Sequence, residues 1–481
     1  MSAVVRHPKH FKKKLKNTVL FGNEPTPELF AILSVYFVQG ILGLARLAVS
    51  FFLKDDLGLT PAQTGALIGI AAIPWVIKPV FGFLSDGLPL FGYRRRPYLI
   101  LSGILGSLSW ILLATVVTNA WLATATLLLT SLSVALSDVI VDSLVVERAR
   151  KESLGQAGSL QSLTWGMSAL GGLITAYLSG WLLQHLSNQT VFAVTAIFPL
   201  IVCAAAWFIA EDPVKEITQV SQPNNFQVKQ QIKLVWQAIK QKSILLPTAF
   251  VFLWQATPNS DSAFFYFTTN ELGFESEFLG RVRLVTSVAS LLGIWGYQKF
   301  LKNVSFREIL GWSVVISSGL GMTTLLLVTH TNRVLGIDDH WFSLGDSLIL
   351  TVAGQIAFLP ILVLSARLCP EGIEATFFAL LMSIVNLSNL LSHELEALLT
   401  HWLGVTETNF DNLWLLVVFT NLSTLLPLPL IRWLPKTDPQ NQEKKAKEKI
   451  LSVSPKIAKN HSLETRSSNL AIPEFVINNE K

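Results

Sequence analysis

Residues 97–117 are PYLILSGILGSLSWILLATVV, and residues 120–146 are AWLATATLLLTSLSVALSDVIVDSLVV. Each run is long enough to cross the hydrocarbon core of a bilayer as a helix, which takes roughly 20 residues. Asp138 and Asp142 are the only charged residues in the two runs. Only helices and closed barrels satisfy their backbone groups in lipid, and these runs are too long and continuous for barrel strands. The stretch therefore predicts two membrane-spanning helices joined by a short loop.

The same pattern continues along the chain. Of the 481 residues, 51% are hydrophobic and 14% are charged, whereas soluble domains carry about 25% charged residues. The mean hydropathy is +0.48. We therefore predict an all-α membrane protein with twelve spans, at residues 28–53, 61–84, 97–117, 120–146, 156–186, 189–210, 244–268, 277–301, 306–329, 344–367, 372–400 and 411–433.

Basic residues occupy alternate loops. They gather in the N-terminal segment, at Arg94–Arg96, between spans six and seven and in the tail, while the opposite loops carry only Lys54 and Arg333. The positive-inside rule then predicts an even number of spans with both termini in the cytoplasm. The net charge of +5 reflects this topology, so we expect no nucleic-acid partner.

The polar stretches divide the chain into two halves of six spans. Within the linker, residues 226–241 mix apolar and basic residues as a surface-lying amphipathic helix does, and the composition of the tail predicts disorder. A faint repeat relates Gln39 to Gln255 and Trp181 to Trp402, which predicts parallel duplication. The predicted units are a basic N-terminus, an N-terminal half, a linker, a C-terminal half and a tail, at residues 1–27, 28–210, 211–243, 244–433 and 434–481.

Several classes of protein are disfavoured. The basic N-terminus is followed by no small-residue cleavage site, so we expect the first span to act as its own insertion signal. Cys203 and Cys369 form no disulfide or metal-binding pattern. We find no nucleophile elbow, metal cluster or phosphate loop, and we predict neither an enzyme nor a bound cofactor.

The loop after the second span carries Gly82-Phe83-Leu84-Ser85-Asp86-Gly87 and then Arg94-Arg95-Arg96. It resembles the signature loop of the major facilitator superfamily, with extra residues before the arginines. Such a loop works as a latch: Asp86 can face the positive N-terminus of a helix in the other half, while Arg94 and Arg95 pair with nearby acidic residues. The alternative is that some of these arginines only mark topology.

Ionisable residues also lie inside the fourth span. Asp138 and Asp142 are four residues apart and share a helix face, and an ionisable residue inside a span costs roughly 2.5–3.5 kcal/mol on insertion scales. Asp138 is a candidate for coupling to a proton, and Asp142 for a structural network with Arg148. In the second half, Arg367 and Glu374 are the candidates for gating or structure.

Further polar residues at membrane depth are candidates for lining a cavity. The seventh span is interrupted around Pro258, and transporters tolerate such a break where a cavity is lined. Amides can instead bond neighbouring helices, for about 0.6 kcal/mol each, and one arginine of span eight can snorkel to the headgroups. Cations, amides and aromatic rings together suit a flat, polar, anionic ligand. The candidates are Gln39, Arg46, Lys78, Gln161, Gln255, Asp261, Arg281, Arg283 and Asn386.

Four stretches of the chain match a known pattern. They are the segment from Lys78-Pro79 to Asp86, the Arg94–Arg96 loop followed by Pro97-Tyr98, the pair Asp138 and Asp142, and Gly280-Arg281-Val282-Arg283. Together they resemble the folate-biopterin transporter family. The resemblance is to its cyanobacterial and plastid members and covers residues 20–435. It implies a secondary transporter of folates or pterins that works by alternating access and is coupled to protons. Cations would hold the carboxylates of the substrate, and Asp138 or Asp261 would carry the proton.

The short N-terminus favours a bacterial inner membrane over a plastid envelope, and we expect no oligomer. Two alternatives remain open at this point. The chain could transport another organic anion or a drug, or it could be a non-transporting assembly factor for photosynthetic pigment-protein complexes, because one fold can host both. Folate flux distinguishes the first alternative, and co-purification with photosynthetic subunits distinguishes the second.

Overall fold

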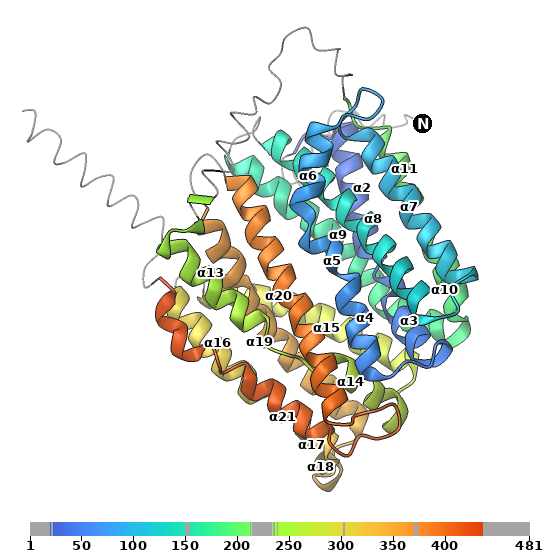
Figure 1. Cartoon of the computed structure of the whole chain (residues 1–481), viewed down its shortest axis with the longest axis vertical. Helices are drawn as coiled ribbons and strands as arrows, with labels where there is room; N and C mark the ends of the chain where they lie inside the picture. The colour runs from blue at the N-terminus through green and yellow to red at the C-terminus, as the bar shows by residue number, and fades with distance from the viewer. Residues whose placement is uncertain are drawn as a thin grey trace, which may run out of the picture.

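The computed structural model describes residues 20, 23–149, 154–211, 213, 233, 236–237, 239–301, 304–369 and 374–435. Only the backbone is described at 86–87, 146–147, 149, 154–159, 161–162, 298, 366–367 and 374–376. The expected amphipathic helix of the linker and the expected disordered tail lie outside this part of the chain. Within it the fold is a bundle of helices, as predicted, and eleven of the helical segments are long and apolar enough to span a membrane (Figure 1).

The first half, drawn in blue to green in Figure 1, supplies six of these segments. Its elements are α2 (Pro27–Ile41), α3 (Leu44–Phe51), η2 (Phe52–Asp56), α4 (Pro61–Ala71), α5 (Ile73–Val76), α6 (Lys78–Gly87), α7 (Arg96–Thr115), α8 (Ala120–Ala149), α9 (Leu154–His185), α10 (Asn188–Thr195) and α11 (Phe198–Ala206). The second predicted span is thus three consecutive helices. Its breaks fall beside Pro74 and Pro79, because proline removes a helical hydrogen bond and clashes with the preceding turn.

The second half supplies the remaining five. Its elements are α13 (Lys242–Gln255), α14 (Asp261–Tyr266), η3 (Phe267–Glu271), α15 (Ser276–Gly296), η4 (Tyr297–Leu301), α16 (Phe306–Gly321), α17 (Thr324–Val328), α18 (Thr331–Val334), α19 (Asp339–Arg367), α20 (Glu374–Trp402), α21 (Leu413–Ser423) and η5 (Leu428–Trp433). The predicted seventh span is broken around Pro258 into α13 and α14, so neither piece alone reaches spanning length. The interruption predicted there is present.

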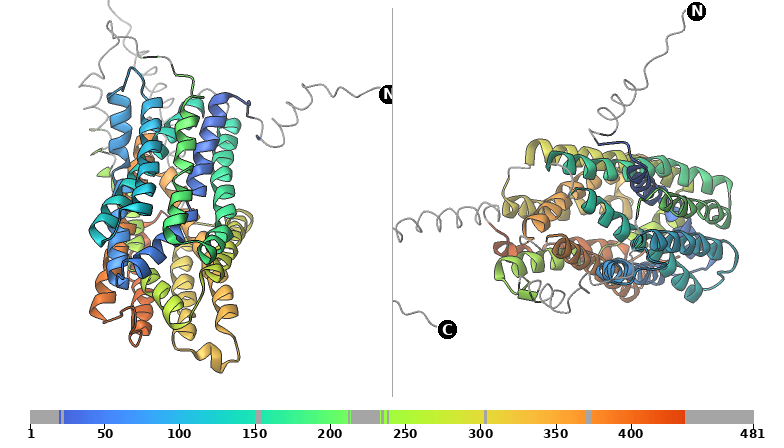
Figure 2. Two further views of the ribbon diagram at one scale, coloured as in Figure 1. Left: turned by 90° about the vertical axis from the view of Figure 1, so that its right-hand side faces the viewer. Right: turned by 90° about the horizontal axis from the view of Figure 1, so that it is seen from above.

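The helices of both halves run between the same two ends of the bundle (Figure 2). We call the end that holds Asn23, the loop 88–95 and Glu211 the linker end, and it lies at the top of Figure 1. The opposite end, which holds the loops 57–60 and 272–275, is the distal end. The hydrophobic core lies inside each half rather than between them, in separate clusters of buried side chains.

Two helix pairs make the most extensive contacts between the halves, α9 with α15 and α4 with α20. In the first pair Gly180 and Gly280 meet backbone to backbone, since a Cβ on Gly280 would lie 2.9 Å from the Gly180 Cα. In the second pair Gly65 faces Ala397. Gly65 and Gly280 each come five residues after the N-cap of their helix, so the two contacts occupy corresponding places in the halves.

The distal end is closed by contacts between the halves. Lys54 Nζ donates to Asn270 Oδ1 at 2.8 Å, and the ring centroids of Phe51 and Phe265 lie 5.3 Å apart. The buried Tyr266 hydroxyl donates to the Leu59 carbonyl at 2.5 Å. These contacts fasten α3, η2 and the loop before α4 to α14 and η3, so the two halves are held together at the distal end in this conformation.

The close approach of α9 and α15 gives a first prediction. Gly280→Val will lower the thermal stability of the purified protein, because its Cβ would also lie 3.0 Å from the Tyr177 carbonyl oxygen and overpacking costs about 1–3 kcal/mol. Gly354→Val is the matched control, since nothing lies within 4 Å of a Cβ there. Equal unfolding temperatures for the two variants would show that the backbones need not touch.

Candidate functional site

The break in the second span exposes a carbonyl that the other half binds. Pro79 has no N–H, so the Trp75 carbonyl lacks its helical donor four residues on. Asn386 of α20 donates its Nδ2 to this oxygen at 3.0 Å. The sequence predicted Asn386 as a cavity residue with helix bonding as the alternative, and the structure places it in a hydrogen bond between the halves.

The break in the seventh span is bound by α20 in the same way. Ser392 Oγ donates to the Thr257 carbonyl at 2.6 Å, and Asn259 Nδ2 donates to Ser392 Oγ at 3.3 Å. On the other side of the break, the Ser262 N–H donates to Glu396 Oε1 at 2.7 Å. Side chains of α20 thus take the backbone groups that the interruption leaves unpaired, as the lack of water in a bilayer demands.

Two arginines lie near each other in the distal half of the bundle. Arg283 of α15 donates through Nη1 to the Gly43 carbonyl at 3.2 Å and to Ser179 Oγ at 3.1 Å, so it joins α15 to the α2–α3 turn and to α9. Arg46 of α3 lies near enough for its positive charge to act on Arg283. No carboxylate of the described side chains lies within ion-pair distance of either arginine.

A second polar group lies in the linker half. Lys78 at the start of α6 forms an ion pair with Asp138 of α8, and its ammonium lies 4.7 Å from the centre of the Trp75 ring. Tyr36 of α2 donates its hydroxyl to Asp142, whose side chain is exposed. The sequence therefore placed Asp138 and Asp142 on one face correctly, and the structure gives each a separate partner.

A third group surrounds the break in the seventh span. Glu396 is fully buried and its Oε2 lies 3.5 Å from Nδ1 of His393. Asp261 opens α14 with an exposed side chain and acts electrostatically on both. His393, Glu394 and Glu396 were not among the predicted site residues. The signal for them was present, because all three are ionisable residues inside the predicted span at 372–400.

The other cavity candidates lie apart from these groups. Arg281 is exposed at the distal rim, where its Nη2 lies 2.7 Å from Glu277 Oε1. Gln39 is half-buried on α2, and its Nε2 has no hydrogen-bond partner among the described atoms. Gln255 is half-buried at the last residue of α13. The side chain of Gln161 lies outside the described part of the chain.

The gating candidates are bound inside the first half where they are described. Glu211, after α11, accepts the backbone N–H groups of Arg94, Arg95 and Arg96, of which the shortest contact is 2.6 Å. A carboxylate at the N-terminus of α7 also favours the helix dipole.

Arg148 donates to the Thr26 hydroxyl and the Glu24 carbonyl, which fixes the end of α8 to the entry of α2. The side chains of Asp86, Arg367 and Glu374 lie outside the described residues.

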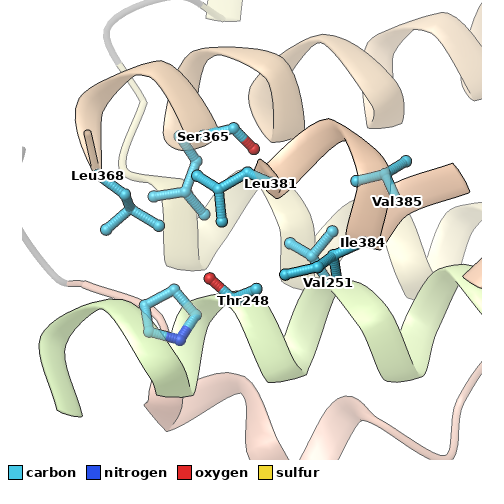
Figure 3. Close-up of a pocket in the computed structure, with 9 residues that line it drawn as sticks. Thr248, Val251, Ser365, Leu368, Leu381, Ile384 and Val385 are labelled. Carbon is cyan, nitrogen blue, oxygen red and sulfur yellow. The ribbon is translucent and has the colours of Figure 1, made fainter. Parts of the chain in front are cut away.

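Two hollows lie away from the three polar groups. A cavity of about 10 Å³ between α13, α19 and α20 is lined mostly by aliphatic side chains, among them Leu368 and Leu381 (Figure 3), and it has room for about one water molecule. A hollow of about 420 Å³ lies over α7 and α11 and is lined by Phe91, Arg96 and Trp207. Neither hollow reaches the arginine pair.

Known proteins resemble this chain over most of its length. The model of the BT1 family matches residues 39–454. The folate-biopterin transporter of Synechocystis sp. is 62% identical over 472 residues, which is 96% of this chain and 94% of the relative. Folate transporter 2 of Plasmodium falciparum is 32% identical over 85% of this chain and 89% of its own length.

Solved structures share the fold at low identity. The nucleoside transporter NupG gives a TM-score of 0.63 at 14% identity, over 84% of this chain and 98% of its own. A D-xylose-proton symporter gives 0.62 at 16% identity, over 85% of this chain and 99% of its own. The fold is therefore of the major facilitator type, as the loop after the second span suggested. With this fold and with relatives named as transporters along most of its length, the chain is a membrane transporter, not an enzyme, and it belongs to the BT1 family.

Proposed function

We propose that this protein moves folates or related pterins across the membrane as a secondary transporter. The observation that carries the proposal is the arginine pair, Arg46 and Arg283. Neither cation has a described carboxylate partner. Arg283 is half-buried on α15 and Arg46 is exposed on α3, and uncompensated charge at membrane depth is expensive. An anionic substrate would supply the missing charge. The glutamate tail of a folate carries carboxylates, and arginine binds carboxylates through charge-assisted hydrogen bonds.

The names of the relatives support this choice of substrate, since proteins named for folate or biopterin transport match the chain over most of its length. The remaining candidates fit the polar part of such a ligand. Gln39, Gln255 and Gln161 would read the ring or its linker, whereas Lys78 and Asn386 stay in the pairs that they form with Asp138 and with the Trp75 carbonyl. Asp138 or Asp261 would carry a coupling proton. No second copy of the chain is needed for this arrangement.

We place the linker end in the cytoplasm, in a bacterial inner membrane, because the basic loops gather at that end. The closed distal end then leaves the centre facing inward. Alternating access would follow when the contacts of Lys54 and Tyr266 break and the linker end closes in turn.

Uptake by the purified chain in proteoliposomes tests the proposal. Labelled folate should accumulate in vesicles that carry an inward proton gradient, and unlabelled folate or biopterin should compete with it. Competition by an unrelated organic anion alone would point to another substrate. The absence of flux for every anion, with the chain correctly inserted, would contradict the proposal and leave the assembly factor as the alternative.

The arginine pair gives the second prediction. Arg46→Ala and Arg283→Ala should each lower folate uptake about tenfold to a hundredfold at equal membrane levels, because hydrogen bonds to charged groups contribute about 1.5–3 kcal/mol. Lysine at either position should retain part of the activity. Lys299→Ala, which removes an exposed positive charge at the linker end of α15 and η4, is the control. Wild-type uptake by both alanine variants would remove the arginines from the binding site.

The third prediction concerns the Lys78–Asp138 ion pair. Replacing either residue alone by alanine should reduce the amount of folded protein, because an unpaired charge in a low-dielectric interior costs about 3–5 kcal/mol. The double variant Lys78→Met/Asp138→Leu should restore the folded amount without restoring transport. Size-exclusion profiles and uptake separate the two effects. A double variant no better folded than the single ones would show that the charges do not depend on each other.

Orientation can be tested with single cysteines in a Cys203→Ser/Cys369→Ser background. A membrane-impermeant maleimide added to intact cells should label Thr118→Cys, in the exposed distal loop before α8. It should spare Phe91→Cys, which is exposed at the linker end, until the cells are opened. The reverse pattern would place the linker end outside.

A further inference from the structure

A cluster of ionisable side chains surrounds the break of the seventh span, and the proposed role of the arginine pair gives this cluster no function. It contains three carboxylates, on Asp261, Glu394 and Glu396, and one imidazole, on His393. Glu396 is fully buried, and its Oε2 accepts no hydrogen bond among the described atoms although it lies 3.5 Å from His393 Nδ1. Even with the imidazole protonated, the three carboxylates would leave this group negative, and the charge is costly on its fully buried member, Glu396.

The charged groups that face His393 come from two elements. They are Glu394 and Glu396 on α20 itself and Asp261 on α14. The helix α4, which packs along α20, has no ionisable residue, and α5 and α21 have none either. Lys242 on α13 and Lys78 on α6 lie towards the linker end. On α19, Asp346 is bound to the hydroxyls of Thr323 and Thr324. The excess negative charge is therefore local.

We propose that His393, Glu396 and Asp261 form the site that binds the coupling proton. This rests on the proposed function, since it names the group that would link substrate flux to the proton gradient. The proton is taken from water at one membrane face, adds to a carboxylate or to the imidazole, and returns to water at the other face. Of the two candidates named above for the coupling proton, this assigns the role to Asp261 and its neighbours rather than to Asp138, which is paired with Lys78.

The position of the site gives it a way to act on the bundle. Glu396 Oε1 accepts the Ser262 N–H at the start of α14, and α14 carries Tyr266, whose hydroxyl binds the Leu59 carbonyl in the distal closure. A change of charge on Glu396 would therefore act on the contacts at the distal end through one short helix, α14. Glu394 and the Cβ of His393 both lie against Gly69 of α4, at the packed surface between the halves.

The test separates proton coupling from substrate binding. Glu396→Gln keeps an oxygen that can accept the Ser262 N–H, and His393→Gln keeps a polar side chain. Purified variants in proteoliposomes should still exchange labelled for unlabelled folate at close to the wild-type rate when no gradient is present. The accumulation of folate that a proton gradient drives should fall about tenfold in both variants. Asp346→Asn, which makes the same change in a carboxylate outside the site, should accumulate folate as the wild type does.

Three results would overturn the inference. Glu396→Gln could accumulate folate from the gradient as the wild type does. It could lose exchange as well, which would mean a substrate or structural role. Accumulation could follow a sodium gradient and ignore the proton gradient. If the wild type itself exchanged no folate or pterin, the proposed function would fail separately.

Proton binding can then be measured without substrate. The pH dependence of the unfolding temperature between about pH 5 and pH 8, the range in which histidine titrates, should flatten in Glu396→Gln and His393→Gln but persist in Asp346→Asn. Identical curves for all four proteins would rule out a proton site here.

Discussion

A backbone N–H or C=O buried in a bilayer needs a hydrogen-bond partner within the protein, because no water can supply one. This constraint explains the contacts made at the breaks of the second and seventh spans. The carbonyl freed by Pro79 binds Asn386, and the carbonyl at Thr257 binds Ser392. Since both donors lie on α20, this one helix completes the second and the seventh spans, which belong to different halves of the protein.

The same constraint brings the functional side chains together. Arg283 reaches the Gly43 carbonyl in the turn between α2 and α3, and Glu396 reaches the N–H that opens α14. Each of these charged residues thus holds a break in another helix while part of its charge stays uncompensated. A substrate anion at Arg283 or a proton at Glu396 would therefore act on the joints of the bundle. That position suits a transporter, because binding of the substrate or a proton has to be linked to opening one end of the bundle and closing the other.

The sequence predicted the spans, the division into halves and the break at Pro258, because hydropathy and proline act locally and are visible in a single chain. It placed Asp138 and Asp142 on one face for the same reason. It did not predict which side chains reach across to another helix. The pairing of Asn386 with Trp75 depends on how two halves pack. His393 and Glu396 could be seen as ionisable residues inside a predicted span, but their position opposite the break in the seventh span depends on how α20 packs against α14.

The central claim is that the distal end closes and opens around the polar centre of the bundle. The most direct measurement is the distance between spin labels at the exposed positions Asp55 and Glu271, each next to the Lys54–Asn270 hydrogen bond, in a Cys203→Ser/Cys369→Ser background. The account predicts a short distance between the labels without substrate. It also predicts a second, longer distance, and the fraction of molecules that show it should change when folate or a proton gradient is applied. A single short distance that never changes, in protein that transports folate, would contradict it.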